Sequence, residues 1–247
     1  MTYCVGLFLE EGVVMLADTR TNAGLDNIST FSKLHVLELP GERVITLATA
    51  GNLAVTQSVL SLLREGVETE SGIETWQTVP SLFRAAQLAG TAIRQVYHTD
   101  GPSMQAQNVG FEVSILLAGQ IAGHDARLFQ IYAAGNFIEA TSDTPFLQIG
   151  EHKYGKPILD RALKYKTDLE SGVKLSLISM DSTLRSNLTV GMPIDLVVYR
   201  RNALQLALRR RITEEDPYFR SIRESWSEAL RNAYRSIPNP DWPGLGS

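Results

Sequence analysis

Short apolar runs alternate with charged or glycine-containing turns over the first fifty positions of the chain. Four of these runs have the length and composition of β-strands: residues 2–9, 13–19, 33–39 and 43–49. Glu10-Glu11-Gly12 and Pro40-Gly41-Glu42 separate strands within this set, and residues of these types favour tight turns. The pattern therefore predicts a meander of antiparallel strands before any helix.

Helices are predicted next, and the order of strands followed by helices then repeats. Apolar residues recur with helical spacing at about 51–65 and 78–98. Further strands are predicted at 110–119, 126–133, 137–140 and 146–149, helices at 155–166 and 170–182, and a last strand pair at 194–199 and 204–212. This order predicts an α+β fold in which sheets are sandwiched between helices.

The C-terminal segment is predicted to form one more helix, beginning near Asp216-Pro217. Aspartate caps helices and proline suits the first helical turn. Its apolar face would pack either on the same chain or on a neighbouring subunit, and it comprises Tyr218, Ile222, Trp226, Ala229 and Ala233. We divide the chain into a single domain over 1–247, in which 213–237 is a helical extension and 238–247 a tail.

Composition narrows the class of protein. The 247 residues are 44% hydrophobic, which is enough to bury one substantial core. A net charge of −4 gives no electrostatic reason to expect nucleic acid or an anionic membrane as partner. No apolar run has the length of a membrane span or the flanks of a secretory signal, and the single Cys4 cannot form an intrachain disulfide. We expect a cytoplasmic protein with no nucleic-acid or membrane partner.

The signatures of several enzyme classes are missing from the sequence. The four histidines have no metal-binding spacing, and there is no Cys-x-x-Cys, Gly-x-Ser-x-Gly or Walker-type motif. The arginines at 200–201 and 209–211 precede three acidic residues, which favours a solvated or locally paired strand end over a phosphate site. We therefore expect neither a metal nor a cofactor.

Thr2 is a candidate nucleophile because it follows Met1 and opens the first strand. Removal of Met1 would give Thr2 a free α-amine, whose ordinary pKa of about 8 lets it accept the hydroxyl proton. Asp18 ends the second strand and Lys33 opens the third, so a hairpin would bring both beside Thr2. A nearby ammonium would favour the deprotonated hydroxyl, and a carboxylate would hold that ammonium in place. The alternative is that Asp18 is a turn residue and Lys33 an exposed strand end.

These motifs resemble the N-terminal-nucleophile hydrolases of the proteasome β-subunit type. Asp18 lies sixteen residues after Thr2 in Ala17-Asp18-Thr19-Arg20, and Lys33 lies in Ser32-Lys33-Leu34. Ala50-Gly51-Asn52-Leu53-Ala54 resembles the family's Ala-Gly-x-x-Ala segment. The bacterial Anbu branch is the most similar, because its members begin Met-Thr-Tyr-Cys-Val-Gly and carry Asp-Thr-Arg-Thr-Asn-Ala-Gly followed by Asp-Asn-Ile. The resemblance covers most of residues 2–200.

The resemblance implies a four-layer αββα sandwich with the nucleophile between the sheets, assembled as a homo-oligomeric ring or helix. It also implies that Lys33 assists Thr2, that Asp18 positions Lys33 and that Gly51 N–H binds the oxyanion. The substrate pocket would include Thr21, Asn22, His35, Thr49 and Leu53. The substrate would be a peptide or protein, which an unidentified unfoldase could deliver.

Two segments depart from the family pattern. Glu151, in Ile149-Gly150-Glu151-His152, takes the place of a serine near the amine, and a carboxylate there could hold the amine protonated. In 181–191 two alignments stay open: either Asp181 is the supporting aspartate and an insertion follows it, or Thr189 takes the serine position, which puts Ser186 at the aspartate position.

Three functions follow from these expectations. The first is a threonine-type peptidase, the second is a scaffold or peptide-binding oligomer with little or no proteolytic activity, and the third is an amidase acting on a small or modified peptide.

Overall fold

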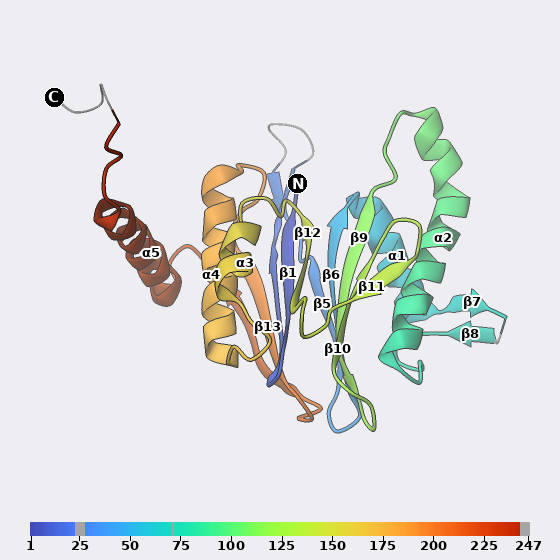
Figure 1. Ribbon diagram of the computed structural model, residues 1–247. Helices are drawn as coiled ribbons and strands as arrows, with labels where there is room; N and C mark the ends of the chain where they lie inside the picture. Colours follow the sequence, from blue (N-terminus) through green and yellow to red (C-terminus); the bar gives the residue numbers. More distant parts are fainter. Residues whose placement is uncertain (23–27, 71, 243–247) are drawn as a thin grey trace.

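Two antiparallel five-stranded sheets form the centre of the molecule in the computed structural model, which describes residues 1–22, 28–70 and 72–242 (Figure 1). The first sheet has the order β12-β1-β2-β13-β14 and is made of Phe146–Gly150, Tyr3–Leu9, Gly12–Asp18, Ile194–Arg200 and Leu206–Ile212. The second has the order β11-β10-β9-β6-β5 and is made of Phe137–Glu139, Arg127–Ile131, Val113–Ile121, Arg43–Gly51 and Leu34–Leu39.

Helices cover the outer face of each sheet, so the layers follow the order α, β, β, α (Figure 1). Helices α1 (Leu53–Glu65) and α2 (Leu82–Ala106) pack on the second sheet. Helices α3 (Lys156–Ala162) and α4 (Leu169–Ser186) cover the first. Helix α5 (Pro217–Ser236) contacts α4 and then projects away from the body, on the left of Figure 1. The predicted four-layer αββα sandwich is confirmed.

Three apolar clusters hold these layers together, and strand β1 contributes to two of them. Tyr3, Val5 and Leu7 pack in the cluster under α3 and α4. Cys4 faces the second sheet and packs in the cluster between the sheets. Successive side chains of a strand point to opposite faces, so a strand buried on both faces is apolar throughout. This double burial explains the continuous apolar run at the start of the sequence.

Several elements differ from those predicted. The helix predicted to end at residue 98 continues to Ala106 and includes Pro102, which lacks the N–H that would bond to the preceding turn. Two small hairpins were not predicted, β3 (Arg20–Asn22) with β4 (Ile28–Thr30) and β7 (Val67–Thr69) with β8 (Gly72–Glu74). Their strands are too short to give an alternating pattern. Among the described residues, no helix is long and apolar enough to cross a membrane.

The strand register gathers the candidate residues at one end of the sandwich. Tyr3 pairs with Gly150 and Cys4 with Ala17, so the start of β1 lies between the ends of β12 and β2. In the second sheet Leu34 pairs with Ala48, which places the start of β5 beside the end of β6. Residues 2, 18, 33 and 51 stand next to these strand ends.

Candidate active site

A buried ion pair lies beside the start of β1. Lys33 Nζ donates to Asp18 Oδ1 at 2.8 Å and to the carbonyl oxygen of Arg20 at 2.6 Å. Asp18 also accepts backbone N–H groups, from Tyr3 at 3.0 Å and from Gly191 at 3.2 Å. Both side chains of the pair are buried, Asp18 as the last residue of β2, so Asp18 is not a turn residue and Lys33 is not an exposed strand end.

Burial and pairing act in opposite directions on Asp18. Burial raises the pKa of its carboxyl above the ordinary value, whereas the Lys33 ammonium and the two backbone amides lower it. A buried charge is costly unless it is paired and hydrogen-bonded. The carboxylate and the ammonium therefore depend on each other, and Lys33 is held in one position.

Thr2 lies immediately before β1 and is only 8% exposed. With Lys33 and Gly51 it lines a cleft of about 820 Å³. Its carbonyl oxygen accepts the N–H of Glu151 at 2.7 Å, which ties residue 2 to the end of β12. The arrangement places a hydroxyl, an ammonium and a backbone glycine around one cleft.

Met1 precedes this hydroxyl and is 64% exposed. Burial, and then the charge of Lys33, lower the pKa of its α-amine, while Asp18 and Glu151 act in the opposite direction. Three residues that were predicted from the sequence, Asp18, Lys33 and Glu151, therefore act electrostatically on the α-amine of Met1.

Gly51 has a backbone conformation and a neighbour that only glycine tolerates. Its φ is +115°, and a Cβ added there would lie 2.2 Å from the carbonyl oxygen of Glu112. The next residue, Asn52, caps α1, since its Oδ1 accepts the N–H groups of Ala54 and Val55. A helix N-terminus thus begins beside the cleft, where its dipole favours negative charge.

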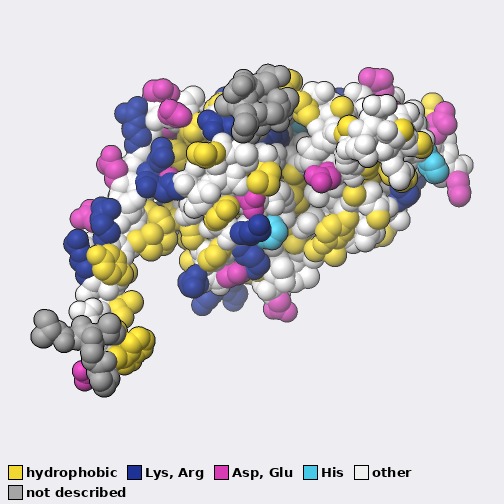
Figure 2. Space-filling view, turned by 90° about the horizontal axis from the view of Figure 1, so that it is seen from above, with side chains coloured by type: hydrophobic (Ala, Val, Ile, Leu, Met, Phe, Trp, Pro, Cys, Tyr) yellow, Lys and Arg dark blue, Asp and Glu magenta, His cyan; other side chains and the backbone are white. Residues whose placement is uncertain are grey.

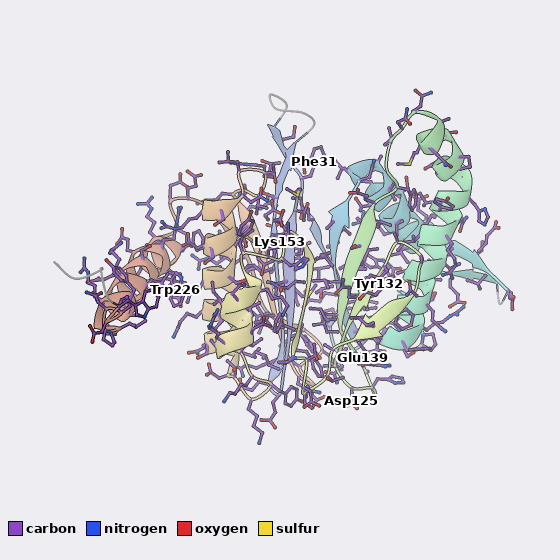
Figure 3. All side chains as sticks on the ribbon, turned by 45° about the horizontal axis from the view of Figure 1, so that its top comes forward. Phe31, Asp125, Tyr132, Glu139, Lys153 and Trp226 are labelled. Carbon is purple, nitrogen blue, oxygen red and sulfur yellow. The ribbon has the colours of Figure 1, made fainter. Side chains whose placement is uncertain are left out.

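The cleft includes three of the five residues predicted for the substrate pocket, namely Thr21, Thr49 and Leu53. The hydroxyl of Thr21 is buried, with no hydrogen-bond partner in the described part of the chain. Asn22 pairs with Ile28 through the β3–β4 hairpin, but its side chain lies outside the described residues. The cleft also has lining residues that were not predicted, among them Phe111, Glu112 and Tyr132, the last of which is labelled in Figure 3.

His35 does not line the cleft, and its assignment to the pocket is corrected. Leu34 and Val36 of β5 pack between the sheets, so the alternation of the strand turns His35 to the other face. Burial lowers the pKa of His35 to about 4, with a smaller contribution from the charge of Arg64 on α1.

Asp181 lies on α4, where its carboxylate binds two arginines outside the cleft. Its carboxylate accepts from Arg185 Nε at 3.0 Å and from Arg223 Nε of α5 at 2.8 Å. Helix α4 extends to Ser186, four residues beyond the predicted end, and leaves Ser186 exposed at its last position. Neither Asp181 nor Ser186 is brought to Thr2, so the helix geometry supports neither assignment.

Glu151 and Thr189 are connected through Asn187, a residue that the sequence did not single out. Asn187 Nδ2 donates to Glu151 Oε2 at 3.0 Å. Asn187 Oδ1 accepts the N–H of Thr189 at 2.9 Å and its hydroxyl at 2.6 Å. Asparagine often binds the backbone two residues on, which is the local signal that could have drawn attention to it.

Arg20 was also missed as a cleft residue. Besides offering its carbonyl to Lys33, it donates from Nη1 to the carbonyl oxygen of Leu188 at 2.9 Å. A Cβ on Gly191 would meet its guanidinium at 2.1 Å, so the glycine leaves room for the arginine.

In residues 1–22, 28–70 and 72–242, no three or more His, Cys, Asp or Glu side chains group in a way that could hold a metal ion.

Comparisons with known proteins agree on one family. The family described as proteasome subunit matches residues 2–199. A solved structure of an Anbu Gly-1 mutant from Hyphomicrobium sp. strain MC1 is 50% identical, with a TM-score of 0.90, and the match covers 98% of this chain and 100% of that one. Anbu (ancestral beta-subunit) from Yersinia bercovieri is 47% identical, with a TM-score of 0.89 and coverage of 99% and 100%.

A third similar structure is the helical assembly of the Anbu complex from Pseudomonas aeruginosa. It is 46% identical, with a TM-score of 0.91, and the match covers 99% of this chain and 100% of that one. No curated protein sequence matches this chain.

Proposed function

Because this chain belongs to the proteasome subunit family, and within it to the Anbu group, we propose that it is a threonine-type peptidase subunit of a proteasome-like homo-oligomer. Thr2 becomes the N-terminal nucleophile once Met1 is removed. The observation that carries the proposal is the buried Asp18–Lys33 pair, whose Lys33 lines one cleft with Thr2 and Gly51.

Each of these four residues has a defined part in the proposed reaction. Thr2 Oγ attacks the carbonyl carbon of a peptide bond, and the α-amine of Thr2 accepts the hydroxyl proton. The Lys33 ammonium favours the developing alkoxide, and Asp18 holds Lys33 in place. The N–H of Gly51, near the N-terminus of α1, receives the oxyanion. The Thr2 ammonium so formed gives this proton to the leaving amine as the peptide C–N bond breaks, which leaves an acyl-ester on Thr2. Water deprotonated by the same amine then hydrolyses the ester, releases the carboxylic acid and regenerates the Thr2 hydroxyl.

The cleft supports a peptide as substrate. Its volume of about 820 Å³ is within the range of sites that bury most of a ligand of several hundred daltons. Apolar walls from Leu53 and Phe111 lie beside polar groups from Thr21 and Thr49. We propose that folded proteins reach such a site only after a separate unfoldase has opened them.

Self-association is supported by α5. Leu230 and Tyr234 on this helix are 50% and 62% exposed, and their spacing of four residues places them on one face of the helix. Hydrophobic side chains are visible along α5 where it projects from the body (Figure 2). The Anbu complex from Pseudomonas aeruginosa forms a helical assembly, and we propose that copies of this chain also join into a ring or helix.

The test is the intact mass of the chain before and after incubation with a peptide epoxyketone, which reacts with both the hydroxyl and the free amine of an N-terminal threonine. We expect the mass of the chain without Met1 and one covalent adduct. Thr2→Ala should lose Met1 and take no adduct, and Thr99→Ala, on α2 away from the cleft, should react like the parent. A processed parent without adduct and without peptide turnover would contradict the peptidase proposal.

The second candidate is a scaffold that keeps the fold and cleaves little. The observation that favours it is Glu151, whose charge acts against that of Lys33 on the α-amine of Met1. This candidate predicts equal residual activity in the parent and in Thr2→Ala, with the same assembly in both.

A further inference from the structure

Glu151 is a buried carboxylate held against residue 2. The chain turns at Gly150, where φ is +78° and an added Cβ would lie 1.9 Å from the carbonyl oxygen of Thr2. The N–H of Glu151 donates to that same oxygen at 2.7 Å. Only 7% of Glu151 is exposed. The backbone geometry therefore fixes this residue beside the start of the chain.

The orientation of Asn187 shows which group faces Glu151. The backbone N–H of Thr189 can only donate, so the Asn187 atom that it meets must be the oxygen. The amide nitrogen of Asn187 then points to Glu151 Oε2 and donates to it. Both Asn187 and Glu151 are buried, so this hydrogen bond holds the carboxyl group of Glu151 in one orientation.

The second oxygen of Glu151 has a weak partner. Lys153 Nζ lies 3.8 Å from Oε1, but the side chain of Lys153, labelled in Figure 3, is 75% exposed. A long and exposed ion pair stabilises a carboxylate very little. The other nearby ammonium, Lys33, already donates to Asp18 and to the carbonyl oxygen of Arg20. A buried carboxylate requires a closer positive charge.

We propose that Glu151, oriented by Asn187, is the counter-ion of the α-ammonium of Thr2 and sets the pH at which the nucleophile becomes active. The proposal rests on the proposed function, since it requires the removal of Met1. Asn187 acts as a positioning residue, and Thr189 fixes the direction of its amide.

The charges around the amine come from several segments. At the α-amine of Met1, one residue earlier, Asp18 at the end of β2 and Glu151 after β12 favour the ammonium, whereas Lys33 before β5 favours the neutral amine. Arg20 on β3 and Glu112 before β9 line the same cleft and carry opposite charges. Only the neutral amine accepts the proton of the Thr2 hydroxyl, so Glu151 holds the reaction back at neutral pH.

The pKa of the amine can be measured without relying on catalysis. The processed and assembled protein is treated with acetic anhydride at a series of pH values, and mass spectrometry quantifies acetylation of the Thr2 amine against an internal peptide standard. We expect Glu151→Gln to lower the pKa of the amine by about 1, so that about tenfold more of it is unprotonated well below that pKa. Glu68→Gln, at an exposed site on β7, should leave the amine unchanged.

Asn187→Ala is the second variant. It keeps the carboxylate but frees it to turn away, so the pKa of the amine should fall in the same direction by a smaller amount. Rates of epoxyketone adduct formation should follow both shifts, with the acid limb of the pH profile of Glu151→Gln moved to lower pH. Light scattering on each variant checks that the assembly is intact.

The outcomes separate this proposal from the function on which it rests. An amine whose pKa is the same in the parent, Glu151→Gln and Asn187→Ala would overturn the counter-ion role even if every protein forms the adduct. A shifted amine without adduct or turnover supports the counter-ion role and contradicts the peptidase. A chain that retains Met1 contradicts both.

Discussion

Asp18 and Lys33 form a buried ion pair beside the cleft, and each charge is stabilised by the other. Asp18→Asn preserves the shape of the side chain but leaves a buried ammonium without its partner. We expect the free energy of unfolding to fall by about 3–5 kcal/mol and peptide turnover to fall by at least about 100-fold. Chemical denaturation and a fluorogenic peptide assay measure the two effects.

The control for this substitution is Asp160→Asn. Asp160 pairs with Lys156 on the exposed surface of α3, where an ion pair contributes about 0–1 kcal/mol. A loss of less than 1 kcal/mol in Asp18→Asn would contradict the mutual dependence of the buried pair.

His35 should make the protein less stable in mild acid. Its pKa is about 4 in the folded chain against an ordinary value of 6.5, so the unfolded chain binds the proton more readily. The resulting stability is present above pH 6.5 and is lost as the pH falls towards 4. We expect a contribution of about 2–3 kcal/mol, reduced because the side chain is only half-buried.

Unfolding by urea at pH 7.5, 6 and 4.5 tests this expectation. The parent should lose more stability over this range than His35→Gln, and His98→Gln, at an exposed position of α2, should behave like the parent. Parallel pH dependences of the parent and His35→Gln would show that the neutral state of His35 is not favoured by the fold.

The junction of β6 and α1 depends on Gly51. Alanine at this position would have an unfavourable positive φ. Its Cβ would also lie 2.2 Å from the carbonyl oxygen of Glu112, the residue before β9. We expect Gly51→Ala to lower the free energy of unfolding by about 2–4 kcal/mol and to abolish epoxyketone labelling. Denaturation and intact mass are the measurements.

Gly41→Ala is the matched control for the backbone effect. Gly41 also has a positive φ, +79°, but an added Cβ there meets nothing within 4 Å. It should cost about 1 kcal/mol and leave labelling intact. If both substitutions cost the same, the close approach of Glu112 to Gly51 would not be the cause.

Helix α5 projects from the body of the molecule, and we expect it to contact neighbouring copies of the chain in the assembly. Leu230→Ser combined with Tyr234→Ser removes apolar contact area beyond the part of α5 that packs on α4. Light scattering should show a lower mean mass at the same protein concentration, with unchanged secondary structure by circular dichroism. Glu228→Gln on the same helix is the control, and an unchanged mass in the double variant would contradict the role of α5.

Apolar patterning was enough to predict most long strands and helices. The strands were recognisable because β1 and its neighbours are buried on both faces and form continuous apolar runs. It did not supply the stacking of four layers, which came from the family resemblance. His35 was assigned to the pocket, and Asp181 to the site in one of two open alignments, from the family resemblance alone. Strand alternation turns His35 to the other face of β5, and Asp181 accepts from Arg223 of α5. Asn187 was missed because its partner Glu151 lies 36 positions away along the chain. Contacts of this kind depend on the relative placement of elements, which a local pattern does not contain.

Strand β14 is an edge strand of the first sheet. Its composition affects whether copies of the protein aggregate through this edge when their concentration is high. An unpaired strand border can recruit the border of another copy and begin a fibril. Most of β14 is exposed, and it carries Arg209, Arg210 and Arg211 in succession. Arg210 pairs with Asp216 and Arg211 with Asp195, so a second copy that approached this border would meet charged side chains already held in ion pairs. Covering these charges would be costly, which protects the protein against edge-to-edge aggregation at high local concentrations.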